Sequence, residues 1–349
     1  MKAAYYYGIG DLRVEEVPVP KIGDNDLLIK VRAAAVCGTD LRIYKSGHFK
    51  IPQGTKRVLS HEIAGEVVEV GKNVSGYSVG DRIATPPNVG CGHCPWCLKG
   101  LNQLCPDYEA FGISYDGGFQ EYMLVPGRAI ERGNAIKIPD SLSYIEAALT
   151  EPLSCTYNAY ESLHTAPGDI VLIVGAGPIG ACHVMISRIA GAGKIIVADI
   201  SDARLAEIQK FGADVVINSA TTNLKQAVLD LTDGIGADVI ITACSVPEIQ
   251  ALALEMAARC GRINFFGGMP QGKEIVPLNT NLIHYKELQV VATTGSSILD
   301  FYQAMRIASS GKISLKDLAT GIFSLDQIQQ AFDYAASGKG MKAVVQMGE

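Results

Sequence analysis

The sequence predicts an α/β protein with two domains, one rich in β-strands and one built on a parallel sheet covered by helices. Two observations lead to this prediction. The chain has 349 residues, more than a single hydrophobic core usually supports. Near residue 150 the pattern also changes, from short apolar runs between turn residues to helical segments that alternate with apolar strands.

The first part of the chain, residues 1–149, has the pattern of a strand-rich domain. Short apolar or alternating runs recur at residues 27–36, 63–70 and 118–125. Gly, Pro, Asn and Asp separate them, as is typical of β-strands joined by turns. Two helical patterns and a strand-like run at 342–345 end the chain. We expect residues 286–349 to return to this first domain.

Residues 150–285 have the pattern of a parallel sheet with helices on both faces. Apolar strand-like runs occur at residues 170–174, 194–198, 215–217, 238–242 and 261–266. Helical stretches separate them, and this alternation is typical of a doubly wound sheet.

Composition and charge exclude several classes of protein. With 48% hydrophobic and 19% charged residues, the chain can bury a large core and does not resemble a disordered protein. A net charge of −6 argues against nucleic acid or an anionic membrane as a partner. The sequence has no long apolar span and no signal-like N-terminus, so a cytoplasmic location is expected.

A glycine-rich turn points to a bound dinucleotide. The run at 170–174 leads into Gly175, Gly177, Pro178, Ile179 and Gly180, and then into a helical stretch. Gly175 permits a tight turn, Gly177 lets the backbone approach a pyrophosphate, and Gly180 permits close packing of the helix on the strand. The helix N-terminus offers N–H groups to the anion. We therefore predict a Rossmann domain.

Asp199 indicates which dinucleotide binds. It ends the second strand of this domain, where a carboxylate can accept hydrogen bonds from the ribose hydroxyls and would repel a 2′-phosphate. The sequence therefore favours NAD over NADP. Arg204, five residues further on, could instead bind a phosphate or cover the adenine.

Four cysteines, spaced by two, two and seven residues, lie within the turn-rich segment 86–106: Cys91, Cys94, Cys97 and Cys105. Four thiolates can close a tetrahedral zinc site of the structural type. Disulfides do not suit the expected compartment, whereas the ligand type does not exclude an iron–sulfur cluster or a zinc-ribbon interaction module. Cys155, Cys182, Cys244 and Cys260 lie in apolar runs and are expected in the core.

A second set of residues could hold a catalytic zinc ion. Cys37 lies in the string Cys-Gly-Thr-Asp, His61 precedes Glu62, and Glu151 lies where the two sequence patterns meet. A thiolate, an imidazole and a carboxylate can bind Zn²⁺ and leave the fourth position open for an alcohol or water. Taken alone, Cys37 is more often a buried core thiol and His61 a structural histidine.

The order of these motifs resembles the alcohol, sorbitol and threonine dehydrogenase branch of the zinc-dependent medium-chain dehydrogenase/reductase superfamily. The resemblance spans essentially the whole chain, from the Cys37 string through His61-Glu62, the cysteine lobe and Glu151-Pro152 to the glycine turn. It implies a GroES-like catalytic domain beside the Rossmann domain, with two zinc ions per chain and NAD as cofactors. A homodimer or homotetramer is also implied.

The resemblance also implies roles for individual residues. Cys37 and His61 bind the catalytic zinc, and Glu62, Glu151 or both in exchange supply a carboxylate ligand. The substrate hydroxyl binds Zn²⁺, which lowers its pKa, and Thr39 takes its proton. A hydride then passes to the nicotinamide, which Phe266 and Thr294 line.

Departures from the family pattern leave the substrate open. Arg42 stands where many alcohol dehydrogenases end their proton relay with a histidine, so the relay exits through water or Arg42 faces an anionic group. Ser60 replaces a glycine before His61, and an Arg-Tyr pair of sorbitol dehydrogenases is absent near residues 293–297. No role is assigned to the remaining histidines: His48, His93, His164, His183 and His284.

We predict a dehydrogenase that oxidises a secondary alcohol or polyol to the ketone with NAD. On the same scaffold, a sugar-phosphate (hexitol phosphate) or threonine dehydrogenase is the alternative. A protein that binds NAD or zinc without catalysis is a more distant alternative, because fold alone does not establish function.

Overall fold

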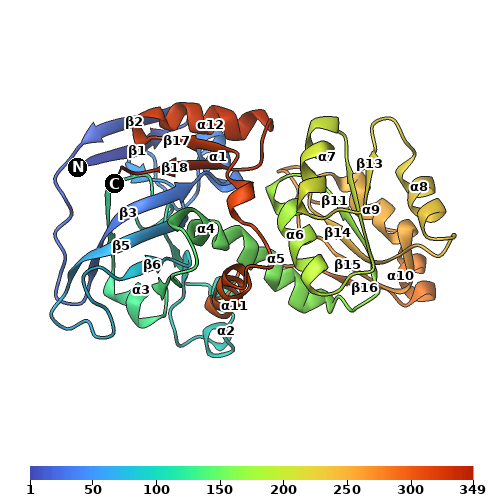
Figure 1. The fold of residues 1–349 in the computed structure, drawn as a ribbon, viewed down its shortest axis with the longest axis horizontal. Helices are drawn as coiled ribbons and strands as arrows, with labels where there is room; N and C mark the ends of the chain where they lie inside the picture. Colours follow the sequence, from blue (N-terminus) through green and yellow to red (C-terminus); the bar gives the residue numbers. More distant parts are fainter. Residues whose placement is uncertain (349) are drawn as a thin grey trace. The chain divides into compact units, whose positions relative to one another are not determined.

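The computed structural model describes residues 1–348, and their contacts divide the chain into two units (Figure 1). The first unit comprises Met1–Ser154 and Ser296–Glu349, and the second comprises Cys155–Gly295. The division falls within helix α5 (Thr150–Leu163), whereas the sequence pattern places the boundary just before this helix.

The first unit contains a seven-stranded sheet of order β10-β6-β5-β3-β18-β17, in which β9 also pairs with β3. Its strands are β3 (Leu27–Ala35), β5 (Glu62–Val70), β6 (Arg82–Ala84), β9 (Tyr122–Val125), β10 (Ile136–Lys137), β17 (Gly321–Phe323) and β18 (Ala343–Gln346). Because β18 pairs antiparallel with β3, with Val344 opposite Ala35, the last strand of the chain lies in the sheet of the early strands.

The smaller elements of the first unit complete its core. A three-stranded sheet has the order β2 (Asp11–Glu16), β1 (Lys2–Gly8), β4 (Arg57–Val58), and β7 (Asn88–Val89) pairs with β8 (Glu109–Ala110). The helices are α1 (Gly38–Ser46), α2 (Pro95–Leu98), α3 (Gly127–Glu131), α4 (Tyr144–Ala148), α11 (Ile298–Ser309) and α12 (Ile328–Ser337). Phe119 and Phe332 meet edge to face in this core, which joins α12 to the early strands.

The second unit is a six-stranded parallel sheet of order β13-β12-β11-β14-β15-β16. Its strands are β11 (Ile170–Val174), β12 (Lys194–Asp199), β13 (Val215–Asn218), β14 (Ala237–Thr242), β15 (Ala257–Asn264) and β16 (Gln289–Val291). Numbered from β11, the order is 3-2-1-4-5-6, which is the Rossmann topology. The predicted doubly wound sheet is confirmed.

Helices cover both faces of this sheet (Figure 1). One face carries α6 (Pro178–Ile189) and α7 (Asp202–Ile208), and the other carries α8 (Leu224–Leu231), α9 (Pro247–Met256) and α10 (Thr280–Lys286). The central strands are therefore apolar along their whole length: Val171, Leu172 and Ile173 are fully buried. Each such side chain contributes about 1.5–3 kcal/mol when buried.

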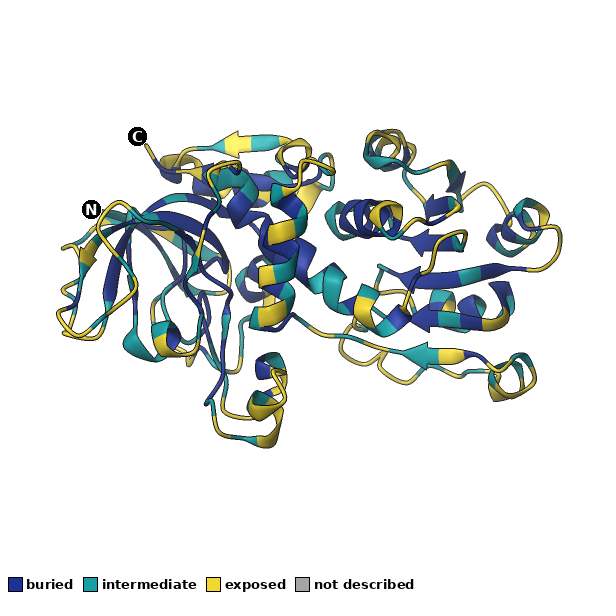
Figure 2. Ribbon diagram, turned by 60° about the horizontal axis from the view of Figure 1, so that its bottom comes forward, coloured by how far each residue is buried: buried dark blue, intermediate teal, exposed yellow. Residues whose placement is uncertain are grey.

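Burial follows the pattern expected for sheets inside each unit. The strands of both main sheets are largely buried, whereas exposed residues gather in loops and on the outer faces of helices (Figure 2). None of the helices within residues 1–348 is long and apolar enough to cross a membrane.

The cysteines outside the two predicted zinc sites differ in burial. Cys182 is buried, and Cys155 and Cys244 are partly buried. Cys260 is exposed and has a positive φ of 59°, so its predicted core position is wrong. It lies within β15 at a backbone conformation that turns its side chain to solvent, which the apolar sequence around it does not reveal.

His183 is a buried histidine within the Rossmann unit. It lies on α6, is 2% exposed, and meets the ring of Phe266 edge to face, with the centroids 4.7 Å apart. Its Nε2 has no hydrogen-bond partner. Burial lowers the pKa of His183 from 6.5 to about 3, so the folded protein holds it neutral.

We expect the free energy of unfolding to fall less at acid pH in His183→Leu than in the original protein. Because the folded pKa lies below the unfolded value, stability is lost as the pH falls from 6.5 towards 3. At pH 5 this loss is about 2 kcal/mol. Denaturation at pH 7.5 and pH 5.0 measures it, and the difference should shrink by about that amount in His183→Leu. The exposed control His284→Gln should leave it unchanged, and equal pH dependence in all three proteins would contradict the prediction.

Candidate active site and cofactor site

The N-terminus of α1 positions Cys37. Cys37 is the N-cap residue of this helix. One oxygen of Asp40, which is fully buried, accepts a hydrogen bond from the Cys37 N–H at 2.8 Å, and the other accepts one from the Ser60 N–H at 3.1 Å. The carboxylate of Asp40 thereby links the backbone at Cys37 to the backbone at Ser60, directly before His61.

Ser60 holds the turn that leads to His61. Its φ is 77°, in the left-handed region that costs a residue with a Cβ roughly 1–2 kcal/mol. The serine hydroxyl donates to the carbonyl of Ala35 at 3.1 Å. Ser60 therefore keeps the turn that a glycine would adopt without strain, and its hydroxyl bond partly offsets that cost.

Cys37, His61 and Glu62 form a cluster able to hold a metal ion. One ligand atom from each lies within 4.8 Å of the others, although the residues come from the start of α1 and the start of β5. Among residues 1–348, the ion-binding group here consists of these three and does not include Glu151. Glu151 is buried, and its charge acts on His61 and on Lys342.

A buried lysine is paired with Glu62. Lys342 Nζ donates to Glu62 Oε1 at 2.5 Å and to the carbonyl of Val36 at 2.8 Å. Lys342 is 5% exposed and Glu62 is 0% exposed. Burial lowers the pKa of Lys342, but the charges of Glu62 and Cys37 outweigh it and hold this pKa above its ordinary value.

The second carboxylate oxygen shows that these residues fit a metal ion. Glu62 Oε2 is buried and has no hydrogen-bond partner, which is costly unless another group satisfies it. Burial lowers the pKa of His61, yet its interactions with Cys37 and the charges of Asp40 and Glu151 hold this pKa well above its ordinary value. This electronegative set of a thiolate, an imidazole and a carboxylate suits Zn²⁺.

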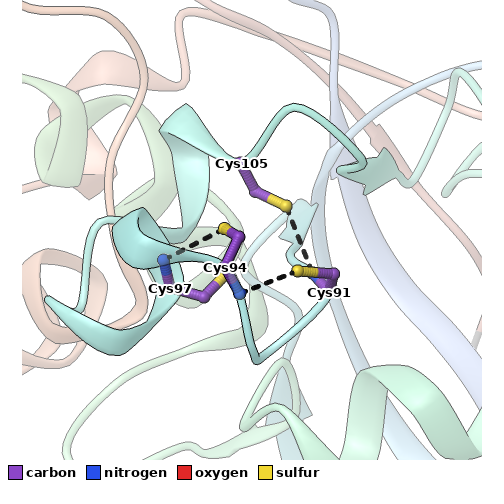
Figure 3. A group of neighbouring side chains, drawn as sticks. All are labelled: Cys91, Cys94, Cys97 and Cys105. Atoms are coloured by element: carbon purple, nitrogen blue, oxygen red, sulfur yellow. Dashed lines mark hydrogen bonds between the residues drawn. The ribbon is translucent and has the colours of Figure 1, made fainter.

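The cysteine lobe brings its four thiols together (Figure 3). Ligand atoms of Cys91, Cys94, Cys97 and Cys105 all lie within 4.8 Å of one another. Backbone N–H groups also point at the sulfurs: the N–H of Cys94 donates to Cys91 Sγ at 3.3 Å, and that of Cys97 to Cys94 Sγ at 3.4 Å. The lobe thus has the geometry of a closed four-thiolate site.

Electrostatics show why the lobe needs a cation. The N–H groups of His93 and Cys94 lower the pKa of Cys91 to about 6, so this thiol is ionised at neutral pH. Burial, together with the neighbouring sulfurs, raises the pKa of Cys97 to about 12. A divalent cation is required for all four to be thiolates at once, since metal binding displaces the protons.

Thr39 lies two residues beyond Cys37, in the first turn of α1. Its hydroxyl is 3.5 Å from Nη2 of Arg42, which is exposed. The predicted proton-relay residue and Arg42 therefore face each other along one side of the helix.

The glycine turn leaves its backbone accessible. Gly175 has a φ of 121°, and a Cβ on Gly180 would lie 2.0 Å from the Gly175 carbonyl oxygen. In contrast, the nearest atom to a Cβ on Gly177 would be Arg204 Nη1, at 3.9 Å. Gly175 and Gly180 are thus required by the turn itself, whereas the open side of Gly177 leaves room for a pyrophosphate. Pro178 and Ile179 open α6 directly after it.

Asp199 lies beside this turn. Its Oδ2 accepts from the Ala176 N–H at 2.8 Å and its Oδ1 from the Ser201 N–H at 3.0 Å. The carboxylate at the end of β12 is therefore fixed next to the glycine turn, while Arg204 reaches the same turn from α7.

Phe266 and Thr294 follow the ends of β15 and β16. Carboxyl ends of parallel strands meet at one edge of a sheet, and ligands bind outside that edge. The structure therefore brings both residues to the edge that carries the glycine turn and Asp199. Thr294 is exposed and Phe266 is partly buried against His183.

Two protein families match this chain. The family described as "Alcohol dehydrogenase GroES-like domain" matches residues 23–140, and that described as "Zinc-binding dehydrogenase" matches residues 178–310. Together they span most of the chain. It belongs to the zinc-dependent medium-chain dehydrogenases.

Known relatives of this dehydrogenase extend over nearly the whole chain. L-threonine 3-dehydrogenase of Pyrococcus abyssi is 36% identical, with 99% of this chain and 97% of the relative covered. Sorbitol dehydrogenase of Bacillus subtilis is 34% identical, with 97% and 94% covered.

Solved structures share the fold of this dehydrogenase. A putative zinc-binding dehydrogenase of Sinorhizobium meliloti bound to NADP has a TM-score of 0.90 and 30% identity, covering 99% of this chain and 98% of the other. An alcohol dehydrogenase of Escherichia coli CFT073 with NADH has a TM-score of 0.89 and 29% identity over 99% of both chains. Galactitol-1-phosphate dehydrogenase of Escherichia coli has a TM-score of 0.87 and 27% identity over 99% and 100%.

These likenesses confirm the predicted family, fold and reaction class. The dehydrogenase combines a GroES-like domain with a Rossmann domain, and it is a zinc-dependent, NAD-linked oxidoreductase that acts on a CH–OH group of a small molecule.

Sequence reasoning missed two residues of the site. Asp40 joins Cys37 to Ser60, and Lys342 pairs with Glu62. Asp40 belongs to the string that contains Cys37, so its place at the third helical position was a usable signal for a cap. Lys342 could be suspected only as a single cation that precedes an apolar strand.

We expect Cys97→Ser to destabilise the dehydrogenase while the surviving folded molecules keep most of their activity. Loss of a metal site is among the changes that cost several kcal/mol, and about 3 kcal/mol would lower the unfolding midpoint by roughly 6–12 °C. Thermal unfolding together with zinc content measures this. The control Cys260→Ser changes an exposed cysteine outside the lobe. It should keep both the unfolding midpoint and the zinc content of the original protein. If Cys97→Ser lost one zinc ion and its unfolding midpoint did not change, the expectation that zinc in this lobe stabilises the protein would be refuted.

Proposed function

We propose that this dehydrogenase oxidises a secondary alcohol group of a small polyol or hydroxy compound to the ketone, with NAD as the hydride acceptor. The observation that supports this most directly is the cluster of Cys37, His61 and Glu62, which leaves a buried carboxylate oxygen without a protein partner. Zinc bound there would supply electrostatic stabilisation of the ionised substrate hydroxyl.

The chain's own residues would act as follows. Cys37 and His61 hold the metal, with Glu62, Glu151 or both in exchange as the carboxylate ligand. Lys342 keeps one oxygen of Glu62 occupied. Thr39 receives the hydroxyl proton of the substrate, because it lies in the first turn of α1, two residues after Cys37.

The second unit would bind the cofactor. The N–H groups at the start of α6 bind the pyrophosphate beside Gly177, and the carboxylate of Asp199 accepts hydrogen bonds from the adenosine ribose. Phe266 and Thr294 line the nicotinamide. Arg204 near Gly177 would contact the phosphates or the adenine. A homodimer or homotetramer in the cytoplasm remains our prediction.

A second candidate is a dehydrogenase of threonine or of a hexitol phosphate. Relatives named for both reactions resemble the chain over nearly its full length, and Arg42 beside Thr39 is the feature of this chain that favours a charged substrate. A substrate panel with NAD tests both candidates. It should contain free polyols, a butanediol, L-threonine and hexitol phosphates, and turnover of none of them by protein that holds two zinc ions would refute the proposed function.

We expect Cys37→Ala to abolish turnover and leave the fold intact. The several kcal/mol that a catalytic metal supplies correspond to a loss of about a thousandfold or more in kcat. Zinc content should fall from two ions per chain to one, while thermal stability stays close to the original. Near-normal rates in Cys37→Ala would exclude the metal mechanism.

We expect Asp199→Ala to narrow the preference for NAD over NADP. A hydrogen bond to a charged group contributes about 1.5–3 kcal/mol, so the ratio of the two kcat/KM values should fall by roughly 10- to 150-fold. Asp202→Ala removes an exposed acid three residues away and serves as the control. The role given to Asp199 is wrong if both variants keep the original ratio of kcat/KM for NAD to kcat/KM for NADP.

A further inference from the structure

Arg42 lies beside the predicted relay residue, Thr39, in the first unit. Arg42 is exposed, and within residues 1–348 its guanidinium has one polar partner, the Thr39 hydroxyl at 3.5 Å. A guanidinium carries five N–H donors in a planar fork, so most of the donor capacity of Arg42 is open. Neither Arg42 nor Lys50 forms an ion pair with a carboxylate within residues 1–348.

The loop after α1 holds two further donors in fixed positions. Ile51 is buried and its N–H bonds to the carbonyl of His48 at 2.9 Å, which makes a turn. Lys50 Nζ lies 3.9 Å above the ring of Tyr108 and donates to the Tyr108 carbonyl. The loop is therefore held at Lys50 and at Ile51.

His48 contributes a neutral donor. The Lys50 N–H donates to His48 Nδ1 at 3.2 Å, so the neutral ring carries its proton on Nε2. Burial and the charges of Lys50 and Arg42 lower the pKa of His48. A chain of net charge −6 has thus placed Arg42, which pairs with no carboxylate in the described part of the chain, next to Thr39.

We propose that the dehydrogenase binds an oxyanion of its substrate, a carboxylate or a phosphate, at Arg42, beside Thr39. This inference rests on the proposed oxidation of an alcohol at the Cys37 cluster. Arg42 binds the oxyanion through its planar fork, so the reacting hydroxyl of the same molecule lies near Thr39. The substrate is then an anionic hydroxy compound and not a neutral polyol.

Matched substrate pairs test the proposal with the two-zinc enzyme and NAD. L-Threonine and its amide differ in the carboxylate, and a hexitol phosphate and the free hexitol differ in the phosphate. In at least one pair the anionic member should have a kcat/KM about 10- to 150-fold higher, the range expected for a charged hydrogen bond. The pair that shows the difference distinguishes carboxylate from phosphate.

Variants identify the residue responsible. Arg42→Gln should lower that ratio at least tenfold, mainly through KM, and Arg42→Lys should fall between the two. Lys45→Gln removes the same charge from an exposed position of the same helix and should preserve the ratio. Pairs that differ by less than threefold, or equal losses in Arg42→Gln and Lys45→Gln, would overturn the proposal while leaving alcohol oxidation intact.

A binding measurement separates this inference from the proposed function. Calorimetric titration of the two-zinc enzyme with inorganic phosphate and with acetate, at constant ionic strength, should show binding that Arg42→Gln weakens at least tenfold and Lys45→Gln does not. If no alcohol of the panel reacts, such binding still supports the oxyanion site, and its absence from the original protein overturns it.

Discussion

The buried pair of Lys342 and Glu62 is the interaction on which the rest of the candidate site depends. Both side chains are almost entirely removed from water, and such a pair is stable only when its remaining hydrogen-bonding atoms are satisfied. Lys342 satisfies one oxygen of Glu62 and the carbonyl of Val36. The other oxygen of Glu62 is buried and has no hydrogen-bond partner among residues 1–348, and Glu62 shares a cluster with Cys37 and His61, so negative charge gathers there that a cation would neutralise.

This pair forms because the last strand of the chain, β18, lies in the same sheet as β3 and β5. β18 pairs with β3, which brings Lys342 next to β5, 280 residues away in sequence from Glu62. Asp40 makes a similar link over a shorter distance, because its two oxygens hold the backbone of Cys37 and of Ser60. The strained φ of Ser60 is thus held by bonds on either side of it.

Local patterns predicted the fold and much of the candidate site. The glycine turn, the cysteine spacing and the strings around Cys37 and His61 are short motifs whose chemistry can be interpreted without tertiary structure. The contacts of Lys342 could not be predicted, because no local signal reports which distant carboxylate a buried lysine will meet. Cys260 shows the opposite error: an apolar sequence context suggested burial, and one positive φ exposes the side chain.

Charges of opposite sign lie around the first turn of α1, and each needs a partner of the other sign. At its N-terminus, the thiolate, the imidazole and the carboxylates leave an excess of negative charge that a buried lysine only partly offsets, and this position suits a metal ion. Beside the same first turn, Arg42 carries positive charge and forms no ion pair with a carboxylate within residues 1–348. A small substrate that carries a hydroxyl and an oxyanion would offer a partner to each position, because each charged group then meets its opposite.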